Sequence, residues 1–100
     1  MANWKRHERE TARALGGKRN ARSNFSESVP DVDHPIFSVE CKYRACLPKL
    51  ITESIAQAVK YASDKIPLAV LKQKGQHGAY VVLRLCDFKA LIEKEARHGE

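Results

Sequence analysis

Three charged side chains in the first half of the chain have types and a spacing suited to binding a divalent cation. Glu40 and Lys42 lie two residues apart, and Asp31 follows Pro30 upstream. In a strand, residues two apart project from one face about 6.6 Å apart along the chain, so both reach one metal-bound water. Mg²⁺ prefers oxygen ligands, commonly one or two carboxylates completed by water and phosphate oxygens. The sequence therefore predicts a Mg²⁺ site, with Mn²⁺ as a substitute, whose ligands are Asp31, Glu40 and the backbone carbonyl of Cys41.

A metal ion held in this way is suited to hydrolysing phosphodiester bonds. The ion polarises the phosphate and lowers the pKa of a bound water, while Lys42 orients that water or offsets charge that develops on the phosphate. The reaction needs no covalent enzyme intermediate. A second acid-x-Lys pair, Asp87-x-Lys89, opens an expected helix, where side chains two residues apart diverge and cannot share a site. Glu40 and Lys42 are therefore the pair that predicts chemistry.

Residues 36–43 are expected to form the strand that positions this pair. Their side chains alternate, with Glu40 and Lys42 on one face, and the opposite face carries Phe37, Val39, Cys41 and Tyr43. A period of two is typical of a half-buried strand. Residues 30–35 begin and end with proline, which predicts a turn between strands, and this turn holds Asp31.

The remaining elements follow from periodicity and from capping residues. Helix formers that end at Gly16-Gly17 predict a first helix over residues 4–15. Apolar residues at intervals of three or four after Pro48 predict an amphipathic helix to about Ser63, and Asp87 is the expected cap of a third helix. Short strands are expected within residues 18–28, 66–71 and 79–85, of which the last two form a hairpin. This order predicts one α/β domain over residues 1–100, a sandwich with a mixed central β-sheet flanked by helices.

The charge balance indicates a polyanionic partner. Eighteen Lys and Arg residues against twelve Asp and Glu residues give a net charge of +6, and such a field attracts nucleic acid. Several cations cluster around the expected metal-binding strand, and we expect phosphate contacts from Lys18, Arg19, Arg22, Arg44 and Lys49. The alternative for each of them is a solvated surface charge.

The cysteines and the apolar runs indicate the compartment. Cys41, Cys46 and Cys86 are an odd set without zinc-ligand spacing, which favours a reducing cytoplasm over a disulfide framework or a zinc site. No apolar run approaches the ~18 residues that cross a bilayer, and the N-terminal residues lack a signal-peptide pattern. We therefore expect a cytoplasmic protein that has no membrane partner.

Several motifs, taken in order, resemble the PD-(D/E)xK nucleases, and in particular the archaeal-type Holliday-junction resolvases and related phage-encoded nucleases. The resemblance covers most of the chain and rests on Glu8-Arg9, Arg22-Ser23, Pro30-Asp31 and Glu40-Cys41-Lys42, followed by the long second helix. It implies the restriction-endonuclease-like three-layer sandwich and metal-dependent cleavage of DNA. It also implies a homodimer that presents two active sites to a branched four-way junction, in the host cytoplasm if the protein is phage-encoded.

The resemblance also assigns roles to residues outside the strand. Glu8 matches the acid that these enzymes bring from the first helix to the metal, through a water molecule, and Arg9 and Ser23 join the DNA-binding set. Gln57 and Tyr61 resemble the QxxxY element of nucleases involved in recombination. The second helix would turn Gln57 toward the site, whereas packing is the simpler explanation for Tyr61.

Two assignments stay open at this point. Asp33 competes with Asp31 as a metal ligand, and the Pro-Asp context favours Asp31. The loop between Arg22 and Asp31 lacks the glycine usual beside a catalytic serine, so Ser26 and Ser28 are alternatives for that part.

The leading hypothesis is a Mg²⁺-dependent, structure-selective DNA endonuclease of the Holliday-junction resolvase type. The first alternative is a general nicking, repair or restriction-like endonuclease on the same fold. The second is a basic DNA-binding module without catalysis, which the intact set of Asp31, Glu40 and Lys42 disfavours.

Overall fold

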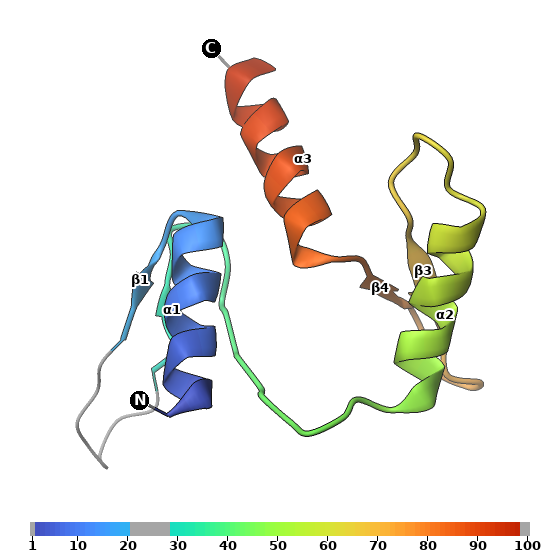
Figure 1. Ribbon diagram of the computed structural model, residues 1–100, viewed down its shortest axis with the longest axis horizontal. Helices are drawn as coiled ribbons and strands as arrows, with labels where there is room; N and C mark the ends of the chain where they lie inside the picture. Colours follow the sequence, from blue (N-terminus) through green and yellow to red (C-terminus); the bar gives the residue numbers. More distant parts are fainter. Residues whose placement is uncertain (1, 21–28, 99–100) are drawn as a thin grey trace. The chain divides into compact units, whose positions relative to one another are not determined.

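The computed structural model describes residues 2–20 and 29–98, and the chain divides into two compact units, Met1–Ala45 and Cys46–Glu100. The described elements are three helices and two small antiparallel sheets, so the protein is of mixed α/β type (Figure 1). Each sheet has two strands. A single mixed sheet between layers of helices therefore stays a prediction. No helix in the described ranges is both long and apolar enough to span a membrane.

Helix α1, Asn3–Leu15, opens the first unit and confirms the predicted first helix. It ends because Gly16 takes the left-handed conformation, with φ 77° and ψ 26°, a conformation that glycine adopts without steric cost. The N–H of Gly17 then donates to the carbonyl of Ala12 at 2.8 Å. One face of the helix is buried, at the helical spacing of Glu8, Thr11, Ala12 and Leu15.

Two short strands pack against α1, and Val32 is their centre. Strand β1, Lys18–Arg19, pairs antiparallel with β2, Val32–Asp33, while Val32 also forms a bridge to Val39. Val32 thus has a neighbour on each side and is fully buried. Gly17, just after α1, lies close to β2. A Cβ at this position would lie 2.6 Å from the Asp33 carbonyl oxygen, so only glycine fits there without a shift.

The structure corrects two predictions for this unit. Residues 30–35 were expected to be a turn, but they contain β2, because the two prolines lie outside the paired residues and remove no ladder donor. The strand expected over residues 36–43 is bridged only at Val39, since β2 offers just two residues for pairing. The predicted β1 region is confirmed at Lys18–Arg19, and the rest of it, residues 21–28, lies outside the described residues.

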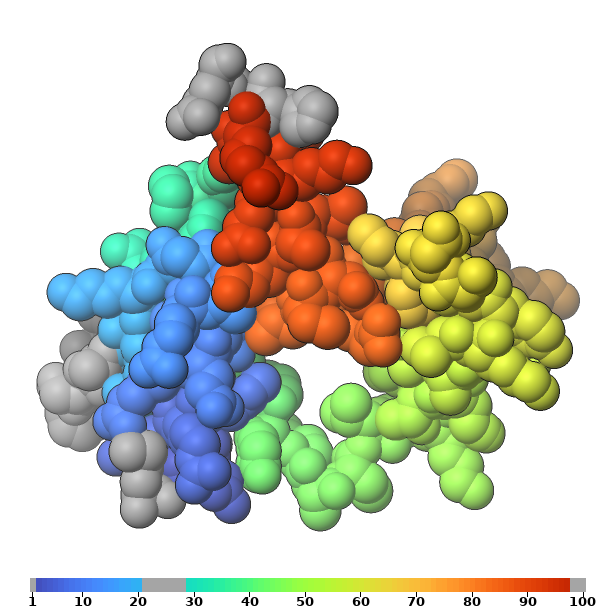
Figure 2. All heavy atoms as spheres, turned by 45° about the horizontal axis from the view of Figure 1, so that its top comes forward, coloured from blue at the N-terminus to red at the C-terminus, as the bar shows by residue number. Residues whose placement is uncertain are grey.

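The second unit contains α2, a hairpin and α3. Helix α2, Lys49–Lys60, is shorter than predicted because Ser63 takes a positive φ of 55°. Strands β3, Ala69–Leu71, and β4, Tyr80–Val82, form the predicted antiparallel hairpin, and α2 packs against β3. None of the α2 residues is buried, and their side chains line the green to yellow surface in Figure 2.

Helix α3, Leu85–His98, ends the described chain. The prediction that Asp87 caps this helix is wrong, because Asp87 lies inside its first turn. Arg84 takes the capping position, since its carbonyl accepts from the N–H groups of Asp87 and Phe88 at 3.1 and 3.0 Å. Its guanidinium Nε also donates to Asp87 Oδ2 at 2.8 Å.

Candidate functional site

Asp31 is held between two neighbouring segments at the start of β2. Its backbone N–H donates to the Val39 carbonyl at 2.9 Å, and its backbone carbonyl accepts from the Asn20 N–H at 3.0 Å. Its side chain is turned toward the same segment, because Oδ2 accepts from the Cys41 N–H at 2.6 Å. Asp31 is 6% exposed. A buried carboxylate is therefore fixed in orientation beside the Glu40-Cys41-Lys42 motif.

Glu8 approaches the same region from the buried face of α1. Its Oε1 accepts from the Arg19 guanidinium Nε at 2.7 Å, and both side chains are largely buried. A charge-assisted hydrogen bond of this length is stronger than a neutral one. Arg19, which was expected to contact phosphate, thus ties β1 to α1 and compensates the charge of Glu8.

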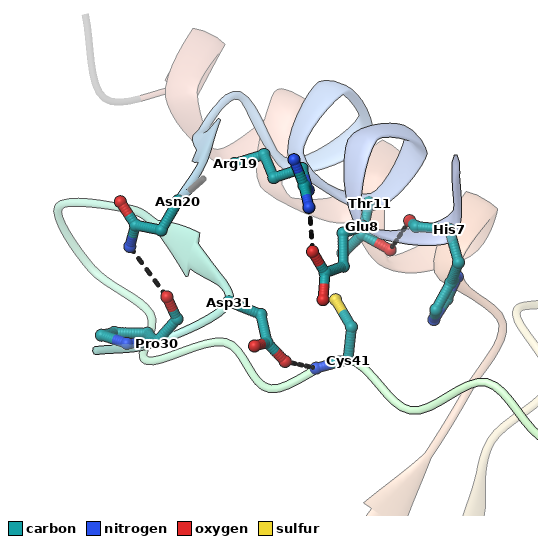
Figure 3. A network of polar contacts seen from close by, with 8 residues as sticks. All are labelled: His7, Glu8, Thr11, Arg19, Asn20, Pro30, Asp31 and Cys41. Carbon is teal, nitrogen blue, oxygen red and sulfur yellow. Dashed lines mark hydrogen bonds and ion pairs between the residues drawn. The ribbon is translucent and has the colours of Figure 1, made fainter. Parts of the chain in front are cut away.

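The Cys41 side chain lies among these carboxylates (Figure 3). Burial raises the pKa of the thiol, a hydrogen bond with Thr11 lowers it in part, and the negative charges of Asp31, Glu8 and Glu40 raise it further. Glu8, Asp31 and Glu40 come from α1, from the residue before β2 and from the segment after it, yet all three act on this thiol. The thiol stays protonated at neutral pH, so it is a poor metal ligand there.

Glu40 and Lys42 flank Cys41 on the exposed side. Both are exposed, whereas Cys41 is half-buried, which agrees with the predicted alternation along this segment. Asp33 is exposed as well and is not among the charges that act on the Cys41 thiol. The geometry therefore links Asp31, rather than Asp33, to the cluster.

The chemistry of the donors matches a hard cation. The nearby groups that carry negative charge are carboxylates, and carboxylate oxygens are what Mg²⁺ prefers. Within residues 2–20 and 29–98, however, no three His, Cys, Asp or Glu side chains are placed so that they could hold a metal ion together. Two carboxylates are already bound by donors, Glu8 by Arg19 and Asp31 by the Cys41 N–H. A metal ion would thus need Glu40 to turn toward Asp31.

The other predicted residues are spread over both units. Arg9 on α1, Lys18 on β1 and Arg44 are exposed in the first unit. Gln57, Tyr61 and Lys49 are exposed in the second unit. The predictions for Arg22, Ser23, Ser26 and Ser28 fall outside the described residues.

Sequence reasoning missed the side chains that hold the cluster together. His34 Nδ1 accepts from the N–H groups of Ile36 and Phe37, so its Nε2 is the protonated nitrogen that donates to the Leu15 carbonyl at 2.9 Å. This bond fastens the end of α1 to β2. Thr11 also donates to the His7 carbonyl at 2.8 Å. The helical spacing of Thr11 with Glu8 and the apolar residues of α1 was the signal that could have identified Thr11.

Comparisons of the chain with protein-family models, with curated proteins and with solved structures found no match.

Proposed function

We propose that the protein is a Mg²⁺-dependent endonuclease that hydrolyses DNA phosphodiester bonds, with branched four-way junctions as its preferred substrate. The observation that supports this best is the buried Asp31 carboxylate, which the Cys41 N–H orients at 2.6 Å beside the Glu40-Cys41-Lys42 motif, with Glu8 approaching from α1. The resemblance to PD-(D/E)xK nucleases names the same three carboxylates, together with Lys42. The proposal includes the restriction-endonuclease-like sandwich, one domain over residues 1–100, and a homodimer whose two sites nick opposite strands.

Each residue has a distinct part in this proposal. Asp31, Glu40 and the Cys41 carbonyl would hold the ion, and Glu8 would act through a water molecule. The bound ion supplies the positive charge that lowers the pKa of a water and polarises the phosphate. The Cys41 N–H keeps the Asp31 carboxylate in one orientation, so little reorganisation is needed at that ligand. Lys42 would orient the attacking water or offset charge that develops on the phosphate.

The substrate is tested with four labelled DNAs of equal length: a four-way junction, a flap, a nicked duplex and a linear duplex. Each is incubated with the protein in Mg²⁺ or in EDTA, and the products are resolved on denaturing gels. Cleavage of the junction that requires Mg²⁺ and exceeds cleavage of linear duplex supports the proposal. Equal cleavage of linear duplex contradicts the junction preference. Binding without products on any of the DNAs contradicts the nuclease assignment.

Matched variants connect such cleavage to the site. Glu40→Gln and Lys42→Met should each remove most of the activity, because one removes the charge of a proposed ligand and the other the proposed donor to the nucleophile. Lys89→Met is the control, since Lys89 stands in the second acid-x-Lys pair and is exposed on α3. An equal loss in Lys89→Met would show that cleavage responds to net charge rather than to this site.

A further inference from the structure

Trp4 is a large aromatic residue whose side chain is half exposed to solvent. It is the only tryptophan of the chain, lies in the first turn of α1 and is 50% exposed within the first unit. Two cations lie near its ring, with Lys5 Nζ 5.4 Å and Arg19 Cζ 5.9 Å from the ring centroid. Both cations lie over the ring within the about 6 Å of a cation–π contact, and the Trp4 side chain is still half exposed.

The same end of α1 departs from what helix stability favours. The first turn holds no acidic residue, and no side chain caps it. The helix dipole favours acidic residues there, yet this end of the helix carries Lys5 and Arg6. Along the whole helix the exposed charges are one acid, Glu10, and the four cations Lys5, Arg6, Arg9 and Arg13. A helix N-terminus that carries cations instead of acidic residues is less stable, and such a loss of stability is typical of a functional surface.

We propose that the surface formed by Trp4 and Lys5 at the start of α1, with Arg19 of β1 beside the ring, is a binding platform for single-stranded DNA, on which Trp4 stacks an unpaired base. Lys5 holds a phosphate next to that base, while the ion pair with Glu8 keeps Arg19 beside the ring. Proteins that bind single strands combine aromatic side chains with cations, because every base has a face for stacking and every phosphodiester carries a negative charge. Two cations over the ring favour an anionic partner over an apolar protein surface.

Arg19 connects this platform to the carboxylate cluster. Its guanidinium lies beside the Trp4 ring, while its Nε donates to Glu8 Oε1. The stacked base is therefore held next to the group that contains Glu8 and Asp31. Bases within a duplex are stacked on one another and cannot offer a face to Trp4, so the platform selects DNA with unpaired bases. Its role beside a cleavage centre rests on the proposed function, but the binding itself does not.

Fluorescence tests the stacking directly, since all tryptophan emission comes from Trp4. A short oligothymidylate is titrated into the whole protein in EDTA, so that no cleavage occurs, and a blunt duplex of the same length is the comparison. We expect saturable quenching by the single strand and weaker quenching by the duplex. Binding of the single strand, detected by anisotropy of a labelled oligonucleotide, without any change in Trp4 emission would overturn the proposal.

Affinity measurements with variants give a second, independent test. Stacking of one base contributes about 1–3 kcal/mol, so Trp4→Ala should weaken single-strand binding about 5- to 150-fold, while Trp4→Phe should keep much of the affinity. Tyr61→Ala is the matched control, because Tyr61 is 74% exposed with Lys60 Nζ 5.6 Å from its ring, but it belongs to the second unit. Circular dichroism verifies that each variant folds.

The outcomes separate this proposal from the nuclease assignment. A loss of affinity in Trp4→Ala with none in Tyr61→Ala supports the platform, even if no DNA is cut in Mg²⁺. An equal loss in both variants, or none in Trp4→Ala, overturns the platform, even if the junction is cleaved.

Discussion

Replacing Asp31 with asparagine separates the hydrogen bond that Asp31 accepts from the Cys41 N–H from the negative charge proposed to bind a metal ion. The amide has the shape of the carboxylate, and its Oδ1 can still accept from the Cys41 N–H, which lies 2.6 Å from Oδ2 in the native protein. The two backbone hydrogen bonds of Asp31 are unaffected by the change. What is lost is the charge, and with it a ligand that a hard cation strongly prefers.

The hydrogen bond from the Cys41 N–H to Asp31 gives one contribution to the stability of the variant. Hydrogen bonds to charged groups contribute about 1.5–3 kcal/mol and neutral ones about 0.5–1.5, so Asp31→Asn should lower the free energy of unfolding by about 1 kcal/mol. Removal of repulsion from Glu8 and Glu40 offsets part of this loss. Asp31→Ala, in contrast, leaves the Cys41 N–H without its acceptor and should cost about 1–3 kcal/mol.

The effect on cleavage should be far larger than the effect on stability. Loss of one preorganised electrostatic group commonly lowers the rate about 10²- to 10³-fold, and a metal ligand should cost at least that. Single-turnover cleavage of a four-way junction measures the rate, and urea unfolding measures the stability. DNA affinity in EDTA should be unchanged or higher in Asp31→Asn, because a charge that repels phosphate has been removed.

Two results would refute the reasoning. Cleavage at the native rate by Asp31→Asn would place any metal site elsewhere in the protein. Equal losses of stability in Asp31→Asn and Asp31→Ala would show that the charge itself, rather than an acceptor for the Cys41 N–H, is what the fold needs.

Three further predictions concern the contacts around this cluster. A double-mutant cycle of Glu8→Met and Arg19→Met in urea unfolding should give a coupling of about 1.5–3 kcal/mol, and a value near zero would contradict the buried ion pair. Gly17→Ala should destabilise the protein by about 1–3 kcal/mol, because the new Cβ would lie 2.6 Å from the Asp33 carbonyl oxygen, and an unchanged midpoint would show that β2 yields. Because its pKa is raised, the Cys41 thiol should form its thiolate only at higher pH, so peptide mapping after alkylation at pH 8 should show slower modification than at the exposed Cys46 and Cys86.

The sequence predicted the helices well because their signals are local. The spacing of apolar residues and the glycine after Leu15 determine α1 with little help from the rest of the chain. The strands were harder, since β2 is defined by what pairs with it. The prolines at 30 and 35 indicated a turn, and only the approach of Lys18–Arg19 and Val39 shows that Val32 is the centre of a small sheet.

The candidate site was predictable to the same extent. Alternation along residues 36–43 correctly separated exposed Glu40 and Lys42 from half-buried Cys41, but it failed at Tyr43, which is 51% exposed. The pairing of Glu8 with Arg19 was not predictable, because it depends on how β1 returns along α1 after Gly16. Arg19, which the sequence assigned to DNA or to solvent, thus forms an ion pair inside the protein.

This commitment of Arg19 explains how a basic protein tolerates three carboxylates in one place. In a chain of net charge +6, a cluster of Glu8, Asp31 and Glu40 opposes the field that would draw DNA toward it. Arg19 and the Cys41 N–H stabilise the two carboxylates that are buried, whereas water solvates the exposed Glu40. A phosphate that approaches the cluster would displace this water and meet the negative charge of Glu40 at short range. In the proposed nuclease, a divalent cation held by Asp31 and Glu40 would offset that repulsion, so the electrostatics of the cluster would favour DNA only with the ion bound.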